Sequence, residues 1–265
     1  MGKLENKVAI VTGAARGNGE GAARVMAREG ATVVLTDILD IVHETARSIV
    51  DNGYQAVSFK MDVTKPAEVG SVVQEVLSRF GRVDILVNNA GVVQLVLLTD
   101  MADEVRDRMF DINIKGTFIV TKAVLPSMLK RKYGRIVNLS SVTGPLVAEI
   151  GECAYAATKA AIWGFTRALA FEVAKEGITV NAVCPGYIET DMVRNSAAET
   201  NPNDPESVLR DLARGIPMGR LGTIEELGEL VAFLASDESK YITGTPILID
   251  GGSTLPESGV LGAAL

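Results

Sequence analysis

Tyr155 and Lys159 are the residues of this sequence whose types and spacing best suit proton transfer. Residues four apart lie on the same face of a helix, one turn from each other. A phenol and a lysine ammonium both titrate at about 10 or above in model peptides, so neither is poised for chemistry at neutral pH. An ammonium beside the phenol, with a further positive charge nearby, would make the phenolate easier to form. Taken alone, the pair is still better explained by an ordinary helix, so the surrounding elements must decide.

Two hydroxyls precede this pair. The apolar run from Arg135 to Leu139 predicts a buried strand, and Ser140 and Ser141 follow at its carboxyl end. His43 is the only histidine and lies in a polar helical stretch, so we expect it to be solvated. A Ser-His-Asp triad and a histidine-based metal site are therefore excluded.

The two cysteines, Cys153 and Cys184, are too few for a disulfide framework or a zinc-ligand cluster. Cys153 lies two residues before Tyr155, but no histidine is available to activate it as a nucleophile. We therefore expect a packed thiol at Cys153 and no bound metal.

Bulk properties limit the possible partners. The 265 residues are 47% hydrophobic, which is ample for the core of one large domain. The net charge of −7 is spread along the chain and argues against a nucleic-acid partner. No uninterrupted apolar run approaches the roughly 18 residues of a membrane span, and residues 1–7 lack an apolar signal core. We expect a cytoplasmic protein that acts on small molecules.

Short apolar runs alternate with longer amphipathic ones, which is typical of an α/β protein with a parallel sheet and helices on both faces. The expected strands are Lys7–Thr12, Thr32–Asp37, Ala56–Lys60, Ile85–Asn88, Arg135–Ser140, Ile178–Cys184 and Pro246–Asp250. The expected helices are Gly19–Glu29, Asp40–Asn52, Lys65–Phe80, Met101–Lys130, Glu152–Lys175 and Thr223–Ser236.

No linker or internal repeat divides the chain, so residues 1–265 are expected to form a single domain. Pro66 indicates a helix start, with Thr64 as the expected cap. The segment from Pro185 to Pro217 is polar and contains Pro202 and Pro205, which predicts an irregular loop. Loops of this length are usually functional, and we expect residues 186–217 to form a substrate lid.

Three glycines follow the first expected strand. Gly13, Gly17 and Gly19 lie between this strand and a helix, with Arg16 among them. Such glycines allow a tight turn and let the backbone approach a pyrophosphate at the helix N-terminus. The spacing is Gly-x-x-x-Gly-x-Gly rather than the commoner Gly-x-Gly-x-x-Gly, and a glycine-rich turn without a ligand remains the alternative.

Asp37 ends the second expected strand, about 20 residues past the glycines, where an acid accepts hydrogen bonds from ribose hydroxyls. Because the carboxylate would repel a 2′-phosphate, it favours NAD over NADP, whereas Arg16 could contact such a phosphate. The alternative is a helix cap. Asp62 and Val63 could meet an adenine edge, or Asp62 could cap the next helix. The Asn-Asn-Ala-Gly sequence ending at Gly91 fits close packing on a nucleotide, and equally a plain tight turn.

Taken together, the glycine turn, the Asn-Asn-Ala-Gly motif and the Tyr155–Lys159 pair, in this order, resemble the short-chain dehydrogenase/reductase family over about residues 4–253. The resemblance implies a single-domain Rossmann fold with a doubly wound, seven-stranded parallel sheet, and a nicotinamide cofactor. It implies that Tyr155 is the general acid/base, that Lys159 tunes it and holds the nicotinamide ribose, and that Ser141 orients the substrate oxygen. It assigns a relay water to Asn113. Cofactor contacts are implied for Asn89, Ala90 and Gly91, and carboxamide contacts for Pro185, Gly186, Ile188 and Thr190.

The sequence departs from this family pattern at two points. Asn18 stands where an aliphatic residue is usual beside the nicotinamide, and the Ser141-to-Tyr155 interval, with Glu149 and Glu152, is slightly long. Two stretches, Asn203–Ser207 and the segment beginning at Ile249, indicate a narrower subgroup of the family.

The resemblance predicts reversible hydride transfer between NAD(H) and a secondary alcohol or ketone. A non-catalytic nucleotide sensor or scaffold is the second hypothesis, and a dehydratase or epimerase is a third, for which the part after Ser236 is short. The expected pocket mixes polar and apolar residues, and comprises Val93, Gln94, Leu95, Thr143, Glu149, Cys153, Tyr187 and Met192. Family members pair their long helices, so a homotetramer is implied and a dimer is possible. Residues 258–265 could cover a neighbour's pocket or be frayed.

Overall fold

All seven strands lie in one parallel sheet. The structure is a computed structural model that describes residues 2–255, so the expectation for residues 258–265 lies outside it. The strand order is β3-β2-β1-β4-β5-β6-β7, and every neighbouring pair is parallel. The strands are β1 Val8–Thr12, β2 Thr32–Asp37, β3 Ala56–Lys60, β4 Ile85–Asn88, β5 Gly134–Leu139, β6 Ile178–Pro185 and β7 Pro246–Ile249. This arrangement confirms the expected doubly wound Rossmann fold.

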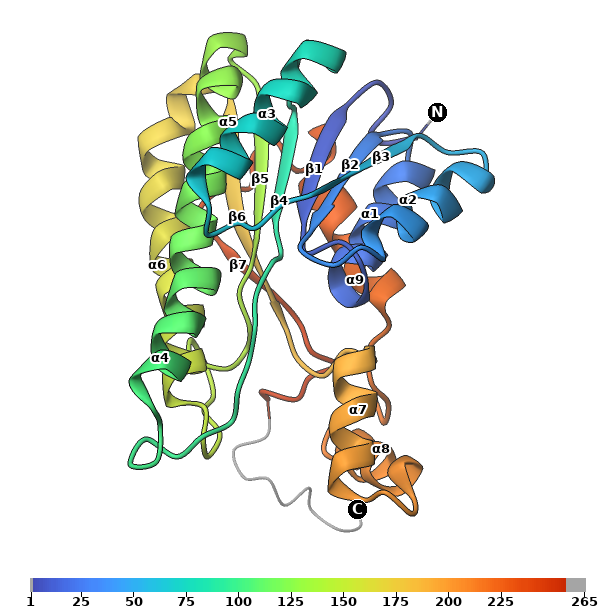
Figure 1. Ribbon diagram of the computed structural model, residues 1–265, viewed down its shortest axis with the longest axis vertical. Helices are drawn as coiled ribbons and strands as arrows, with labels where there is room; N and C mark the ends of the chain where they lie inside the picture. Colours follow the sequence, from blue (N-terminus) through green and yellow to red (C-terminus); the bar gives the residue numbers. More distant parts are fainter. Residues whose placement is uncertain (1, 256–265) are drawn as a thin grey trace.

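Helices cover both faces of the sheet (Figure 1). One face carries α1 Gly17–Arg28, α2 Val42–Asp51 and α9 Ile224–Leu234, and the other carries α3 Pro66–Phe80, α5 Thr117–Arg131 and α6 Cys153–Val173. Strand side chains alternate between the two cores, since Ala9 and Val11 pack in the first and Val8 and Ile10 in the second. Being covered on both sides, β1, β4, β5 and β6 are buried throughout.

One expected helix is interrupted. Met101–Lys130 was expected to be continuous, but α4 spans Asp103–Phe110 and a π-helical turn, Asp111–Gly116, separates it from α5. The side chain of Asn113, inside that turn, bonds to the backbone of Val92. A π-helical turn contains an extra residue compared with an α-helical turn, and hydrophobic periodicity does not reveal it. Such π-bulges are frequent at functional sites. A smaller correction concerns α3: its N-cap is Lys65 rather than Thr64, and it forms no side-chain cap.

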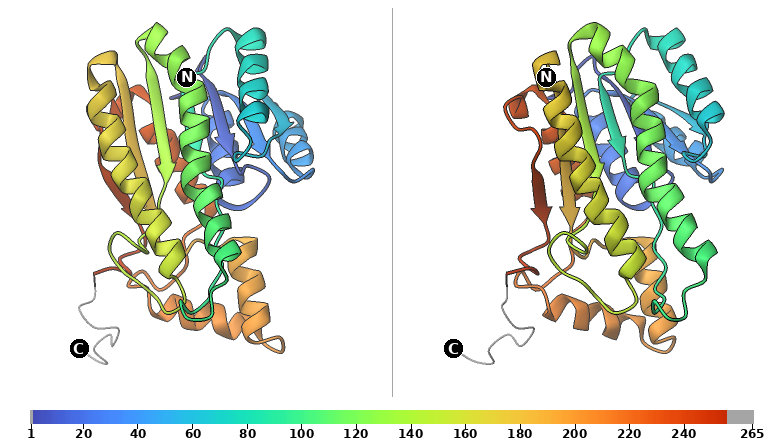
Figure 2. Two further views of the ribbon diagram at one scale, coloured as in Figure 1. Left: turned by 60° about the vertical axis from the view of Figure 1, so that its left-hand side comes forward. Right: turned by 90° about the vertical axis from the view of Figure 1, so that its left-hand side faces the viewer.

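The segment expected to be irregular, Pro185 to Pro217, contains two helices. These are α7, Asp191–Thr200, and α8, Pro205–Arg214. Thr190 caps α7 by accepting from Val193 N at 3.4 Å, and Asp204 caps α8 by accepting from Ser207 N at 3.1 Å, with Pro205 at the first helical position. Pro205 therefore starts a helix instead of preventing one, and Pro202 lies in the short connection between α7 and α8. Both helices lie together beyond the carboxyl ends of the strands, apart from the two main layers (Figures 1 and 2).

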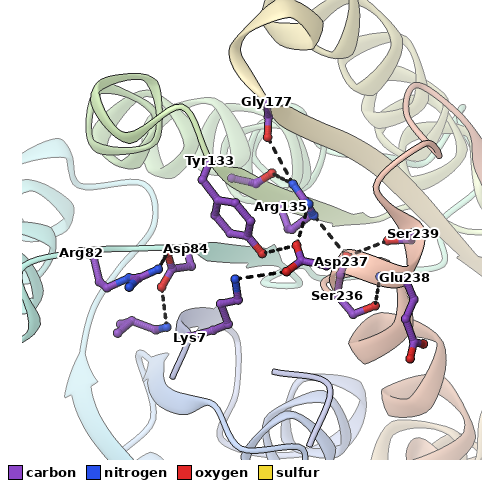
Figure 3. Close-up of polar contacts among 12 residues, drawn as sticks. Lys7, Arg82, Asp84, Tyr133, Arg135, Gly177, Ser236, Asp237, Glu238 and Ser239 are labelled. Carbon is purple, nitrogen blue, oxygen red and sulfur yellow. Dashed lines mark hydrogen bonds and ion pairs between the residues drawn. The ribbon is translucent and has the colours of Figure 1, made fainter. Parts of the chain in front are cut away.

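A polar cluster closes the opposite edge of the sheet, at the amino ends of the strands (Figure 3). The buried Arg135 guanidinium donates to the carbonyl oxygens of Gly134, Gly177 and Ser236, and to Asp237 Oδ1 at 2.9 Å. Tyr133 also donates to Asp237 Oδ1 at 2.9 Å. The segment after α9 is thereby fixed to the base of β5. This cluster lies at the edge opposite the carboxyl ends of the strands, where the expected functional residues lie.

Candidate active site

The glycine turn after β1 packs so closely that a side chain is excluded at Gly13 and Gly19. A Cβ atom added at Gly19 would lie 2.2 Å from the Gly13 carbonyl oxygen, and one at Gly13 would lie 2.8 Å from Ala90 Cα. Gly13 and Gly17 also have left-handed backbone angles, with φ of 64° and 60°. The turn delivers the N-terminus of α1 to the carboxyl edge of the sheet. The N-cap Arg16 is exposed and forms no side-chain cap, so the first-turn amides of α1 are not satisfied by a cap.

The Asn-Asn-Ala-Gly segment holds this turn in place. The Asn89 side-chain amide donates to the carbonyl oxygens of Thr12 and Gly13 at 3.0 and 2.8 Å. In return, the Thr12 hydroxyl accepts from the backbone amides of Asn89 and Ala90 at 3.0 and 3.1 Å. Asn89 therefore braces the turn. Thr12 belongs to no recognised motif, and its position at the end of β1, immediately before Gly13, was the available signal for its role.

Asp37 also supports the glycine turn. Its carboxylate accepts from Ala15 N and from Leu39 N, both at 3.0 Å. Helix α2 begins only at Val42, so Asp37 does not act as its cap. One lone pair on each carboxylate oxygen is left to accept from a ribose hydroxyl. Asp62 is engaged in a local turn, accepting from the Thr64 amide and hydroxyl at 2.8 and 2.7 Å, and Val63 beside it is buried.

A chain of hydrogen bonds joins the Asn-Asn-Ala-Gly segment to the helix that carries Tyr155. Val92 N donates to Asn113 Oδ1 at 2.8 Å, and Asn113 Nδ2 donates to the Thr158 hydroxyl at 3.0 Å. The Thr158 hydroxyl in turn donates to the Tyr155 carbonyl oxygen at 2.7 Å. Thr158 is fully buried and was missed by the sequence analysis. Its place between Tyr155 and Lys159 was the signal that could have found it.

Lys159 and Ser141 meet Tyr155 at the end of β5. The Ser140 hydroxyl donates to the Lys159 carbonyl oxygen, and Lys159 Nζ donates to the Leu139 carbonyl oxygen, both at 2.8 Å. Lys159 Nζ also lies 5.6 Å from the centre of the Tyr155 ring. Ser141 accepts from Thr143 N at 3.1 Å, and the hydrogen-bonding influence of its hydroxyl acts to lower the pKa of Tyr155, against the larger effect of burial. The hydroxyl, phenol and amine therefore share one small region at the carboxyl edge of the sheet.

Burial sets the titration of these groups. It raises the pKa of Tyr155 to about 12, while the hydrogen bond with Ser141 acts against the shift and the charge of Glu152 reinforces it. Burial also lowers the pKa of Lys159 to about 8, opposed by the Cys184 sulfur. In the protein alone desolvation is the largest influence on the Tyr155 pKa, so easier formation of the phenolate still depends on the further positive charge that a bound cofactor would add. At neutral pH Tyr155 carries its proton.

The segment after β6 closes the site from the other side. Val142 N donates to the Pro185 carbonyl oxygen at 3.0 Å, which ties the segment to the loop after β5. Gly186 packs against Asp250, and Ile188 is buried and forms a bridge with Gly222. The methyl group of Thr190 lies 3.6 Å from where a Cβ of Gly17 would be. Of the residues expected at the carboxamide, Thr190 thus adjoins the glycine turn.

Some of the expected substrate residues are buried or hydrogen-bonded within the loops of the site, and the others are exposed at its edge. Tyr187 donates its hydroxyl hydrogen to Glu149 Oε1 at 2.6 Å, which joins the segment after β6 to the loop after β5, while Thr143 is buried beside Ser141. Val93 is half-buried, whereas Gln94, Leu95 and Met192 are exposed. Cys153 is also exposed, so the packed thiol expected there is wrong. As the first residue of α6, Cys153 lies where the helix leaves the loop, on the face away from the buried Ala154.

These features fit a dinucleotide. The glycine turn is a cradle that a Cβ at Gly13 or Gly19 would fill, and it presents uncapped helix amides suited to a pyrophosphate. Asn18 carries a buried Oδ1 atom with no hydrogen-bond partner in the described part of the chain. Residues 2–255 contain no cluster of three His, Cys, Asp or Glu side chains able to hold a metal ion. Within the same residues, no helix is both long and apolar enough to cross a membrane.

Comparison with known proteins gives matches along almost the whole chain. The family model described as enoyl-(acyl carrier protein) reductase matches residues 13–254. The oxidoreductase UcpA of Salmonella typhimurium is 55% identical over 97% of this chain and 98% of its own, and that of Escherichia coli K12 is 54% identical over the same shares. The 3-oxoacyl-(acyl-carrier-protein) reductase FabG of E. coli K12 is 41% identical over 94% of this chain and 98% of its own.

Among solved structures, levodione reductase superposes with a TM-score of 0.90 at 32% identity, covering 95% of this chain and 98% of that one. The family indicated by the sequence motifs is thus reached from sequence and from structure independently. This chain is a member of the short-chain dehydrogenase/reductase family of oxidoreductases.

Proposed function

We propose that this protein is an NAD(H)-dependent dehydrogenase/reductase that transfers hydride between the nicotinamide and a secondary alcohol or ketone, with Tyr155 as the general acid/base. The observation that supports it most directly is that residues 89–92 contact the glycine turn through Asn89 and, through Val92, Asn113 and Thr158, are hydrogen-bonded to the helix backbone at Tyr155. A protein that only binds nucleotides has no need to fix a phenol, an amine and a hydroxyl at the edge of its nucleotide site.

The residues would divide the work as follows. The amides of the glycine turn hold the pyrophosphate, Asp37 holds the adenosine ribose, and Lys159 holds the nicotinamide ribose. A bound nicotinamide supplies or accepts the hydride. Ser141 and Tyr155 hydrogen-bond the substrate oxygen. In reduction Tyr155 donates its proton to this oxygen, and in oxidation it takes the proton from the hydroxyl.

Lys159, together with a relay water held by Asn113, would carry the proton between Tyr155 and solvent. The lowered pKa of Lys159, about 8, suits a group that both takes and releases protons. The raised pKa of Tyr155 keeps the phenol protonated at neutral pH, which is the form that reduction requires. Oxidation therefore depends on removal of this proton, and its rate is expected to rise with pH, whereas reduction is not.

NAD is proposed over NADP because of Asp37. A 2′-phosphate would place a second negative charge beside a carboxylate already fixed by Ala15 N and Leu39 N. The exposed Arg16, in the glycine turn, could contact such a phosphate and opposes this choice. The discriminating measurement is kcat/KM for both cofactors in wild type and in Asp37→Asn. The variant should shift preference toward NADP by ten-fold or more if the carboxylate sets it.

The decisive test is turnover of a panel of alcohols and ketones with NAD(H) and NADP(H), in wild type and in Tyr155→Phe. We expect wild-type turnover, a loss of about 10²–10⁴-fold in the variant, and unchanged NADH binding by fluorescence titration. NADH binding without turnover of any carbonyl would favour the sensor or scaffold hypothesis instead. A near wild-type rate in Tyr155→Phe would remove Tyr155 from its proposed role.

A homotetramer is proposed, with a dimer as the alternative. Exposed aromatic side chains, Phe118 on α5 and Phe171 on α6, lie on helices that cover one face of the sheet, and Leu248 on β7 is also exposed. Large exposed apolar groups of this kind mark interfaces. Size-exclusion chromatography with light scattering measures the subunit number. Cell fractionation tests the proposed cytoplasmic location.

A further inference from the structure

One carboxylate in the wall of the candidate active site is not used by the fold. Glu152 is the N-cap residue of α6, yet its side chain makes no capping hydrogen bond. Its Oε2 atom is buried and has no partner among the described residues. Neither Glu152 nor Glu149 forms an ion pair within residues 2–255. A buried acceptor left in this way is costly unless something donates to it.

The position of Glu152 connects it to the reacting groups. Residues three apart share a helix face, so Glu152 lies on the same side of α6 as Tyr155, one turn earlier. The charge of Glu152 contributes to the raised pKa of Tyr155, and the side chain of Thr143, whose amide donates to Ser141 Oγ, acts to lower the pKa of Glu152, which burial raises. Glu152 is thus next to both groups that would hold the substrate oxygen.

A second acid, Glu149, adds another hydrogen-bond acceptor to the same loop. Glu149 lies in the same loop and is fixed by the Tyr187 hydroxyl at 2.6 Å, so its carboxylate cannot swing freely away. The charge of Glu149, after burial, contributes to the raised pKa of Glu152, which indicates that the two acids are near each other. A substrate with an anionic group close to the reacting carbon would meet two carboxyl groups without an ion-pair partner. A substrate with a donor would satisfy one of them.

We propose that Glu152 is a specificity-determining residue that selects substrates carrying a hydrogen-bond donor, a hydroxyl or an ammonium, on the carbon next to the reacting one. This inference rests on the proposed function of the site and adds the substrate class to it. Ser141 and Tyr155 engage the reacting oxygen, while Glu152 Oε2 accepts from the neighbouring donor. Vicinal diols, hydroxyketones and amino alcohols have this pattern, whereas 2-hydroxy acids present a carboxylate instead.

The test compares matched alcohols that differ only in the neighbouring group. Oxidation of 2,3-butanediol, 3-amino-2-butanol, 2-butanol and lactate is measured in wild type and in Glu152→Gln, and each compound is also measured as an inhibitor of the best substrate. A hydrogen bond to a charged group is expected to give the diol or the amino alcohol an advantage of about ten-fold to a hundred-fold in kcat/KM over 2-butanol. Glu152→Gln should reduce this ratio about ten-fold, and it should raise kcat/KM for lactate relative to that for 2-butanol.

The ratio of two substrates within one protein does not depend on how much of that protein is folded. Glu172→Gln makes the same substitution at an exposed position of α6, about 30 Å along the helix, and should leave the ratio as in wild type. Comparison of 2,3-butanediol with 3-amino-2-butanol distinguishes selection of a hydroxyl donor from selection of an ammonium donor. Equal ratios in wild type and Glu152→Gln, or a preference for lactate, overturn the inference while the proposed function stands. Absence of turnover and inhibition for every alcohol removes the proposed function and the inference with it.

Discussion

Asn113 and Thr158 join the π-helical turn to the catalytic helix: the Asn113 side-chain amide donates to the Thr158 hydroxyl at 3.0 Å, deep in the protein. Asn113 also exchanges hydrogen bonds with both backbone groups of Val92. The Thr158 hydroxyl in turn donates to the Tyr155 carbonyl oxygen. The position of the helix backbone at Tyr155 is therefore tied to residues that need not touch the substrate.

Thr158→Val should reduce kcat while cofactor binding persists. The substitution keeps the shape of the side chain but removes the hydroxyl, which leaves Asn113 Nδ2 without one of its acceptors. A small misplacement of a catalytic group costs up to about 10²-fold, and we expect a loss of about 10- to 100-fold in kcat. Thr158→Ser restores the hydroxyl and should recover most of the activity. An equal loss in both variants would indicate a packing effect instead.

The order and type of the elements could be predicted because each strand is a short apolar run and each helix has an apolar face. Thr32–Asp37, Ala56–Lys60 and Ile85–Asn88 have the bounds expected from the sequence. The π-helical turn could not be predicted, since Asn113 defines it through a contact with Val92, 21 residues away. Likewise, α7 and α8 depend on the local caps Thr190 and Asp204, whereas the prolines between them suggested a loop.

The candidate site was predictable to the extent that its residues stand in motifs. Tyr155, Lys159 and Ser141 do meet at one edge of the sheet, as the motifs required. Burial was not predictable in the same way. Whether Cys153 faces solvent and whether Tyr155 is desolvated both depend on how the loop after β5 folds over α6, which no spacing in the sequence records.

Gly19→Ala should abolish cofactor binding. Its Cβ atom would lie 2.2 Å from the Gly13 carbonyl oxygen and 2.5 Å from Asn89 Nδ2, so the turn would have to open. Gly70→Ala in α3 is the matched control, because an added Cβ there meets nothing within 4 Å. We expect Gly70→Ala to stabilise the protein by about 0.5–1 kcal/mol through helix propensity. Titration with NADH and thermal unfolding measure the two effects, and tight NADH binding by Gly19→Ala would contradict the close-packed turn.

Asp237→Ala should destabilise the protein by about 1–3 kcal/mol without changing KM, because it leaves part of the buried Arg135 guanidinium unpaired at the edge opposite the site. The cluster in Figure 3 shows Asp237 between Arg135, Tyr133 and Lys7. Asp211→Ala removes an exposed ion pair with Arg214 and should cost no more than about 0.5 kcal/mol. Urea unfolding followed by circular dichroism compares them. Equal costs would mean that the cluster adds no more than a surface pair.

Lys159→Met should stabilise the protein without cofactor at neutral pH, and the gain should disappear as the pH rises. Burial lowers the pKa of Lys159 from 10.5 to about 8, so the unfolded chain binds one more proton than the folded one between these values. Wild-type stability therefore rises with pH across this window, and below it the buried charge costs on the order of 3 kcal/mol. The lost hydrogen bond to the Leu139 carbonyl oxygen offsets part of the gain in the variant.

The measurement is the free energy of unfolding of both proteins from pH 7 to 10.5. Lys122→Met removes one positive charge from an exposed position of α5 and controls for the general effect of that loss. A stability difference between Lys159→Met and wild type that stays constant above pH 8 would show that the lysine is not desolvated as its burial indicates. A difference that shrinks toward zero identifies Lys159 as a group whose charge the fold opposes, which is the property expected of a lysine that takes and releases protons beside Tyr155.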